Sequence, residues 1–184
     1  MNARELLFDA AERVLRREGV SGLTSRAVTD EASVAKGVMH RHFTDFDAFL
    51  AELILDRTVQ LKATPTQVAG TGTVIDNLTA ALMAMFTPLA VAMVALVITR
   101  DGLRERLRAA GGARFPLLAE GTCIVSTYLT EEQALGRVDV TADIPTLSHL
   151  LIGSAHLLFT EYEEVPPDAA TLRTVVAGVL RGAG

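Results

Sequence analysis

The sequence contains no tryptophan, a single cysteine and few aromatic residues. Because Cys123 stands alone, an intramolecular disulfide framework and a cysteine-cluster metal site are both excluded. Aromatic residues make up 5% of the 184 residues and hydrophobic residues 49%, so a core must consist mainly of Ala, Leu and Val. This composition suits closely packed helices better than a β-sandwich. We therefore expect an all-α protein, long enough to bury its own core.

Catalytic and metal-binding motifs are also missing from the sequence. It has no phosphate-cradling glycine loop, Walker motif or dinucleotide fingerprint. His149 and His156 would stand two helical turns apart, roughly 10 Å, which is too far to share one metal ion. Glu131 and Glu132 are typical of a solvated helix end. We expect no enzymatic activity, no catalytic residue, no metal and no cofactor.

Charged residues are absent from Leu78 to Thr99, a run long enough to be considered as a membrane span. In its middle, Thr87 and Pro88 are typical of a helix start, with Thr87 as the N-cap. Since Trp and Tyr anchors are also missing from its ends, we interpret the run as two buried helices. A membrane-associated helical protein remains the alternative. No secretory signal is evident, so a cytoplasmic protein with no membrane partner is the default expectation.

Helical patterns cover most of the chain. The first is an amphipathic helix over residues 4–18 that ends at Gly19. Short helices at about 25–32 and 35–42 follow, and then a longer one at about 45–62. After a linker at 64–72, further helices are expected at 73–86, 88–99, 101–109, 113–134, 143–163 and 168–181.

Two short helices that are joined by a tight turn at 33–34 and packed on a third helix form a helix-turn-helix arrangement. The second short helix would enter the major groove of DNA. Its Lys36, Gly37, His40 and Arg41 can face outward. Residues 1–50 hold seven Lys and Arg against eight Asp and Glu, and the whole chain has a net charge of −5. DNA binding must therefore come from a local surface, with modest non-specific affinity.

Residues 19–26, 32–37, 39–43 and 47–50 resemble the DNA-binding domain of the tetracycline-repressor (TetR) family. The resemblance implies a ligand-responsive transcriptional regulator, expected to be a repressor, that binds a pseudo-palindromic operator as a homodimer. It also implies a three-helix DNA-binding domain at 1–50, connected by the helix at about 45–62 to a larger effector-binding and dimerisation domain at 51–184. The expected DNA contacts are Thr24, Ser25, Arg26, Ala35, Lys36, Gly37, His40, Arg41 and His42.

Several positions depart from the family pattern. Ser33 stands where the family usually has Gly, and Ala35 where a Ser caps the recognition helix. His40 replaces the usual Tyr, Phe46 a Lys that contacts phosphate, and Thr29 an Ala. These departures favour an alternative function: a helical dimer of the same fold with weak or lost DNA binding, acting as a small-molecule-binding or interaction protein.

The resemblance further implies an effector pocket and a dimer interface in the second domain. Met-rich apolar walls adapt to varied ligands, and the few charges nearby favour an apolar or neutral effector. The expected pocket residues are Met83, Phe86, Met93, Phe115, Cys123, Thr127 and His156, with Met85 beside them. The expected dimer residues are Leu147, Leu151, Ser154, Leu158, Leu172, Val175, Val176 and Val179. The effector would favour a dimer geometry whose recognition helices are wrongly spaced for the operator.

Overall fold

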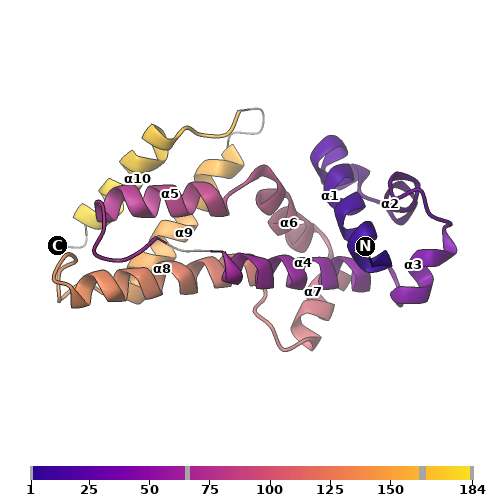
Figure 1. Cartoon of the computed structure of the whole chain (residues 1–184), viewed down its shortest axis with the longest axis horizontal. Coiled ribbons are helices and arrows are strands. Elements are labelled where there is room, and N and C mark those ends of the chain that lie inside the picture. The colour runs from indigo at the N-terminus through magenta and orange to yellow at the C-terminus, as the bar shows by residue number, and fades with distance from the viewer. Residues whose placement is uncertain (1, 65–66, 162–164, 183–184) are drawn as a thin grey trace. The chain divides into compact units, whose positions relative to one another are not determined.

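The computed structural model describes residues 2–64, 67–161 and 165–182 (Figure 1). Within these ranges the chain forms helices and no strand, which confirms the all-α prediction. The helices are α1 (Ala3–Gly22), α2 (Ser25–Glu31), α3 (Gly37–His42), α4 (Phe46–Ala63), α5 (Val74–Met85), α6 (Pro88–Thr99), α7 (Asp101–Ala109), α8 (Pro116–Ala134), α9 (Ile144–Glu161) and α10 (Ala169–Arg181). Each predicted helix has a counterpart among them.

The predicted helix ends differ from the observed ones at a few places. Gly19 has a φ of 69° and interrupts the regular helix, but helical residues continue to Gly22. The helix α3 begins at Gly37, two residues later than predicted, and α8 begins at Pro116 instead of residue 113. The predicted end of the ninth helix, residue 163, lies outside the described residues.

Side-chain caps explain several of the helix starts. The Thr24 hydroxyl accepts a hydrogen bond from the Ala27 amide at 3.1 Å, at the start of α2. The Thr87 hydroxyl accepts one from the Ala90 amide at 3.2 Å, with Pro88 at the first position of α6. The predicted helix start at Thr87 and Pro88 is therefore confirmed.

The chain divides into two compact units. The first comprises Met1–Val59 and Ala92–Pro116, and the second comprises Gln60–Val91 and Leu117–Gly184. The functional boundary after residue 50 stays a prediction, and it does not coincide with this division. Residues 92–116, which include α7, group with the N-terminal segment.

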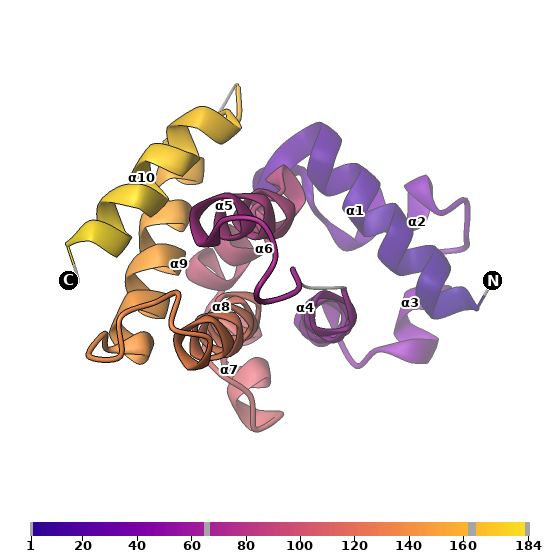
Figure 2. The same cartoon turned by 60° about the vertical axis from the view of Figure 1, so that its left-hand side comes forward.

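In the first unit, α2 packs against α1 and α3 (Figures 1 and 2). A cluster of buried rings joins α1, the end of α3 and the start of α4. Phe8, Phe43 and Phe49 are each less than 5% exposed, and their ring centres lie 5.0 to 6.1 Å apart. Burying each such ring contributes about 1.5–3 kcal/mol. This cluster fixes α3 against α1 and the first turns of α4.

In the second unit, α10 packs against α5 and α9. The core between these helices and α8 is mostly aliphatic, with Leu82, Leu129 and Leu172 fully buried. The charge-free run divides between the two cores, since Leu78 is buried in this unit and Leu96 in the first. No single described helix is long and apolar enough to cross a membrane, although the bent pair α5 and α6 passes by length and composition together.

Candidate nucleic-acid interface and ligand cavities

A tight turn joins α2 to α3. The Ser33 amide donates to the Asp30 carbonyl and the Val34 amide to the Thr29 carbonyl, both at 3.1 Å. Ser33 has a φ of 53°, in the left-handed region that favours glycine. The buried Thr29 hydroxyl donates to the carbonyls of Ser25 and Arg26 at 3.1 and 3.0 Å, so this polar group is satisfied within α2.

The orientation of α3 is set by one buried side chain. Met39 is 1% exposed and receives a hydrogen bond from the Ser25 hydroxyl at 3.1 Å. The opposite face of α3 is therefore open to solvent. Of the nine residues predicted to contact DNA, Ser25 is half-buried and the other eight are exposed: Thr24, Arg26, Ala35, Lys36, Gly37, His40, Arg41 and His42.

Charges in this region are separated, although their totals nearly cancel. Arg13 and Arg17 both donate to Glu31, at 2.7 and 2.8 Å, and these bonds lower the pKa of that carboxyl. Among the residues that the structure describes, Lys36 and Arg41 form no ion pair. The exposed face of α3 is thus locally positive, because the nearby Glu31 carboxylate is already paired with Arg13 and Arg17.

The start of α4 is tied to α7 and the residue before it. The Asp45 carboxylate accepts from the Ala48 amide at 2.8 Å, pairs with Arg106, and has a pKa lowered first by the amide bond. The Asp47 carboxylate accepts from Nε of Arg100 at 2.7 Å. Sequence reasoning missed Arg100 and Arg106, because their partners lie 53 and 61 residues away in the chain.

Two departures from the family pattern are visible at α3 and α4. At the first turn of α3 no side chain caps a backbone amide, as expected from an alanine at position 35. Phe46 stacks on Phe49 with ring centres 5.6 Å apart, so its side chain packs within the domain. A ring in this position contributes to packing and supplies no charge to a phosphate.

The predicted effector residues occupy several different places. Phe86 stacks on Phe159 in the core of the second unit and lies 6.1 Å from the His156 ring, and Met83 packs against the same core. Nδ1 of His156 is buried without a hydrogen-bond partner among the described residues, and burial lowers the pKa of this ring. Met93 and Phe115 belong to the first unit. Cys123 and Thr127 are exposed on α8 and line one cavity together.

That cavity has a volume of about 320 Å³ and is lined by polar and charged residues together with apolar surface. Its lining residues are Lys62, Gln67, Glu120, Cys123, Ile124, Thr127, Tyr128 and Glu131. A smaller cavity of about 100 Å³ shares Gln67 and Ile124 with it and is mainly apolar, with Leu61, Thr64, Ala80, Ala81, Ala84 and Met85 as the remaining lining residues. The two cavities adjoin, because Gln67 and Ile124 line both of them. In the described part of the chain, no three His, Cys, Asp or Glu side chains gather as around a metal ion.

Glu132 is fully buried, so its interpretation as solvated surface is wrong. Its Oε1 accepts from the Tyr128 hydroxyl at 2.6 Å and from the Gly70 amide at 3.2 Å, and Arg137 pairs with Oε2 at 3.2 Å. Burial, followed by the bond to Glu132, raises the pKa of Tyr128 to about 12. Asn77 also donates to the Tyr128 hydroxyl at 2.9 Å. The network holds the loop before α5 on α8.

The predicted dimer residues lie on two sides of α9 and α10. Four of them belong to the protomer's own core: Leu147, Leu151, Leu172 and Val176. The other four are half-buried: Ser154, Leu158, Val175 and Val179. The solvent-facing side of α9 instead presents Leu150 and Leu157, which are 50% and 59% exposed, with open space around the Cα of Gly153. The eight predicted dimer residues stay a prediction.

Comparisons with known proteins agree with this geometry. Residues 7–53 match the family model of the bacterial regulatory proteins of the tetR family. A transcriptional regulator from Rhodococcus sp. Rha1 has a similar structure, with a TM-score of 0.73 and 21% identity over 99% of this chain and 98% of that one. The fatty acid degradation regulator FadR from Bacillus halodurans has a TM-score of 0.71 and 17% identity over 98% and 95% of the two chains.

A third similar structure is the transcriptional regulator FadR from Bacillus subtilis, solved in complex with stearoyl-CoA. Its TM-score is 0.70 and its identity is 16%, over 98% of this chain and 99% of that one. At these identities the structural likeness establishes the fold. None of the curated protein sequences matches the chain.

Proposed function

The chain belongs to the tetR family of bacterial regulatory proteins, and we propose that it is a transcriptional repressor that binds DNA as a homodimer and is released by a small effector. Regulators of this family are DNA-binding proteins and not enzymes. The proposed DNA surface is the exposed face of α2 and α3.

The observation that carries the proposal is the unpaired charge on α3. Lys36 and Arg41 are exposed and form no ion pair with the described residues, and His40 and His42 are exposed beside them. A helix of this width fits the major groove, where cationic side chains reach phosphates and guanine edges. Gly37 has open space around its Cα, so the start of α3 can approach the DNA closely.

A dimer would present two such helices to the DNA. We propose that the exposed side of α9, with Leu150, Gly153 and Leu157, packs against the same surface of a second copy. A symmetric dimer places its recognition helices one DNA turn apart, about 34–36 Å, or a multiple of it, and reads a pseudo-palindromic operator.

For the effector we propose the adjoining cavities beside α8. The apolar body of the ligand would lie against Ala81, Ala84 and Met85, and a polar group would reach the Tyr128 side of the larger cavity. The complex of the similar Bacillus subtilis regulator with stearoyl-CoA supports the general idea of a ligand-responsive protein. Ligand binding would shift the dimer toward a geometry that does not fit the operator.

The second candidate function is a dimer of the same fold that has lost strong DNA binding. It is favoured by the uncapped start of α3 and by Phe46, which packs on Phe49 where a lysine would reach phosphate.

Selection of DNA fragments at physiological salt, including the region upstream of the chain's own gene, tests the proposal. Enrichment of a pseudo-palindrome is expected. Lys36→Ala and Arg41→Ala should each weaken its binding, and each should reduce the slope of log affinity against log salt by about one for a lost phosphate contact. The control is Arg108→Ala, which also removes one positive charge. Arg108 is exposed and lies on α7, away from the proposed DNA surface on α2 and α3. A folded dimer that enriches no DNA would establish the second candidate function instead.

A further inference from the structure

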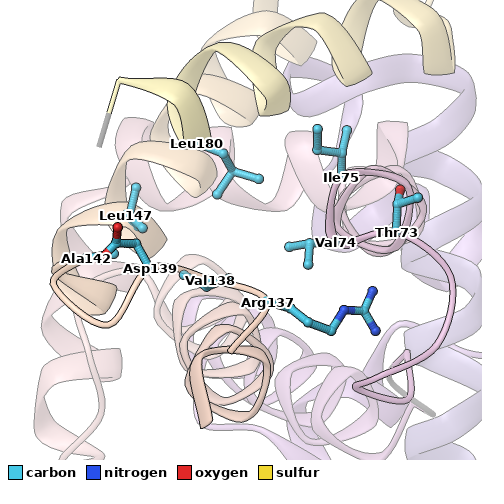
Figure 3. Close-up of a pocket in the computed structure, with 9 residues that line it drawn as sticks. All are labelled: Thr73, Val74, Ile75, Arg137, Val138, Asp139, Ala142, Leu147 and Leu180. Carbon is cyan, nitrogen blue, oxygen red and sulfur yellow. The ribbon is translucent and has the colours of Figure 1, made fainter. Parts of the chain in front are cut away.

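A separate cavity of about 300 Å³ lies among the first turn of α5, the α8–α9 loop, α9 and the last turn of α10 (Figure 3). It shares no lining residue with the cavities beside α8. Most of its wall is apolar: Val74, Ile75, Val138, Ala142, Leu147 and Leu180. Such a wall would bind a hydrocarbon body, and the volume is at the lower end of the range for ligand sites, about 300–1,000 Å³.

Thr73 and two opposite charges, Arg137 and Asp139, complete the wall. Figure 3 shows the guanidinium of Arg137 and the carboxylate of Asp139 on opposite sides of the cavity, with Val138 between them in the chain. A ligand that spans this cavity would therefore meet a cation at one end and an anion at the other.

The Arg137 guanidinium is held in place but retains a donor. Its Nε pairs with Glu132 at 3.2 Å, and its Nη2 donates to the Gly72 carbonyl at 2.6 Å. Within the described ranges, Nη1 makes no hydrogen bond. Because two contacts already fix the side chain, a carboxylate bound to Nη1 would cost little additional ordering of the protein.

The Asp139 carboxylate is fixed in the same way. Its Oδ1 accepts from both the amide and the hydroxyl of Thr141 at 2.7 Å, and these bonds hold the pKa of the carboxyl below its usual value. No described residue donates to Oδ2. An ionised carboxylate with one oxygen to spare is suited to bind an ammonium group.

We propose that this cavity binds a small zwitterion whose apolar chain separates a carboxylate, held by Arg137, from an ammonium group, held by Asp139. The site lies within the second unit, and its occupation does not depend on whether the chain binds DNA.

Calorimetric titration of the full chain provides the test. The probes are unbranched ω-amino acids from 4-aminobutanoate to 8-aminooctanoate, each compared with the fatty acid, amine and alcohol of the same length. One of the ω-amino acids should bind, and its matched acid and amine should each bind at least about tenfold more weakly, because each lacks one charge-assisted hydrogen bond. Equal binding of the alcohol, or no binding of any ω-amino acid, would overturn the proposal.

Three variants locate the binding. Ala142→Phe fills the cavity and should abolish binding, whereas Val140→Phe, in the same loop at a position that is 85% exposed, should leave it unchanged. Asp139→Asn should remove the advantage of the ω-amino acid over the fatty acid while the Thr141 contacts persist. This variant keeps the test decisive if Ala142→Phe fails to fold. Unaltered selectivity in Asp139→Asn would rule out the proposed ammonium site.

Discussion

The guanidinium of Arg100 lies over the ring of Phe46, 5.4 Å from its centre. The same guanidinium donates through Nε to Asp47, so two successive residues at the start of α4 contact one arginine. The residue that the family pattern would use to contact phosphate is here part of an intramolecular contact. In this chain, that contact fixes the helix that directly follows α3.

Phe46→Lys should therefore have two opposing effects. It removes the ring stacked on Phe49 and places an ammonium beside Arg100, so the free energy of unfolding should fall by about 1–2 kcal/mol. If the proposed DNA binding is correct, the new lysine should also steepen the salt dependence of DNA affinity by about one phosphate contact. Urea unfolding and DNA titration over a salt series measure the two effects separately.

Phe46→Leu is the matched control, because it loses the aromatic contact without adding a charge. Its stability should fall while its salt slope stays that of the unchanged chain. A slope that rises equally in both variants would show that position 46 acts through the orientation of α4 and not through a phosphate contact.

The helices could be predicted from the sequence because apolar periodicity and caps act over a few residues. Thr87 caps the helix that it was expected to cap, and Thr24 caps α2 in the same way. The periodicity of α9 and α10 correctly marked apolar faces, but it cannot tell the core of one chain from a surface for a second. Leu151 thus proved to be a core residue, while its neighbour Leu150 faces solvent.

Features of the site that depend on distant residues could not be predicted. Nothing in the local pattern relates Asp47 to Arg100, or shows that Gly70 and Arg137 would enclose Glu132. Most of the expected effector residues are apolar, and an apolar side chain is equally typical of a core. Cys123 and Thr127 line one cavity together.

Ser33→Gly should stabilise the chain. The φ of 53° at Ser33 strains a residue with a Cβ, while glycine loses more conformational freedom on folding, so we expect a net gain of about 0.5–1 kcal/mol. Ala35→Gly lies in the same turn without a positive φ and should instead destabilise by a similar amount. Thermal and urea unfolding of both variants give the comparison. A loss of stability in Ser33→Gly would mean that its side chain, and not its backbone, governs the turn.

Leu157→Asp should disrupt the proposed dimer. A carboxylate at this exposed position of α9 would be buried without a partner in a symmetric interface, and it would meet its copy or lie near it. Sedimentation velocity should then show a monomer with unchanged helicity. Leu135→Asp is the control, since Leu135 is 57% exposed but follows α8. If Leu157→Asp remains a dimer, the interface lies elsewhere on the chain.

Tyr128 should make stability fall in alkaline solution. Burial and the bond to Glu132 raise its pKa from 10 to about 12 in the folded chain, so the folded state keeps the phenolic proton over a range where the unfolded state loses it. The resulting stabilisation, about 2–3 kcal/mol, is complete below pH 10 and is lost as the pH rises through 12.

Tyr128→Phe lacks this titration and also leaves an oxygen of Glu132 with one donor fewer, so it should be less stable at neutral pH by about 1–3 kcal/mol. Guanidinium unfolding at a series of pH values should show the difference between the two proteins shrinking from pH 9 to pH 12. A difference that stays constant over this range would mean that Tyr128 ionises equally in both states and that the buried network does not retain its proton.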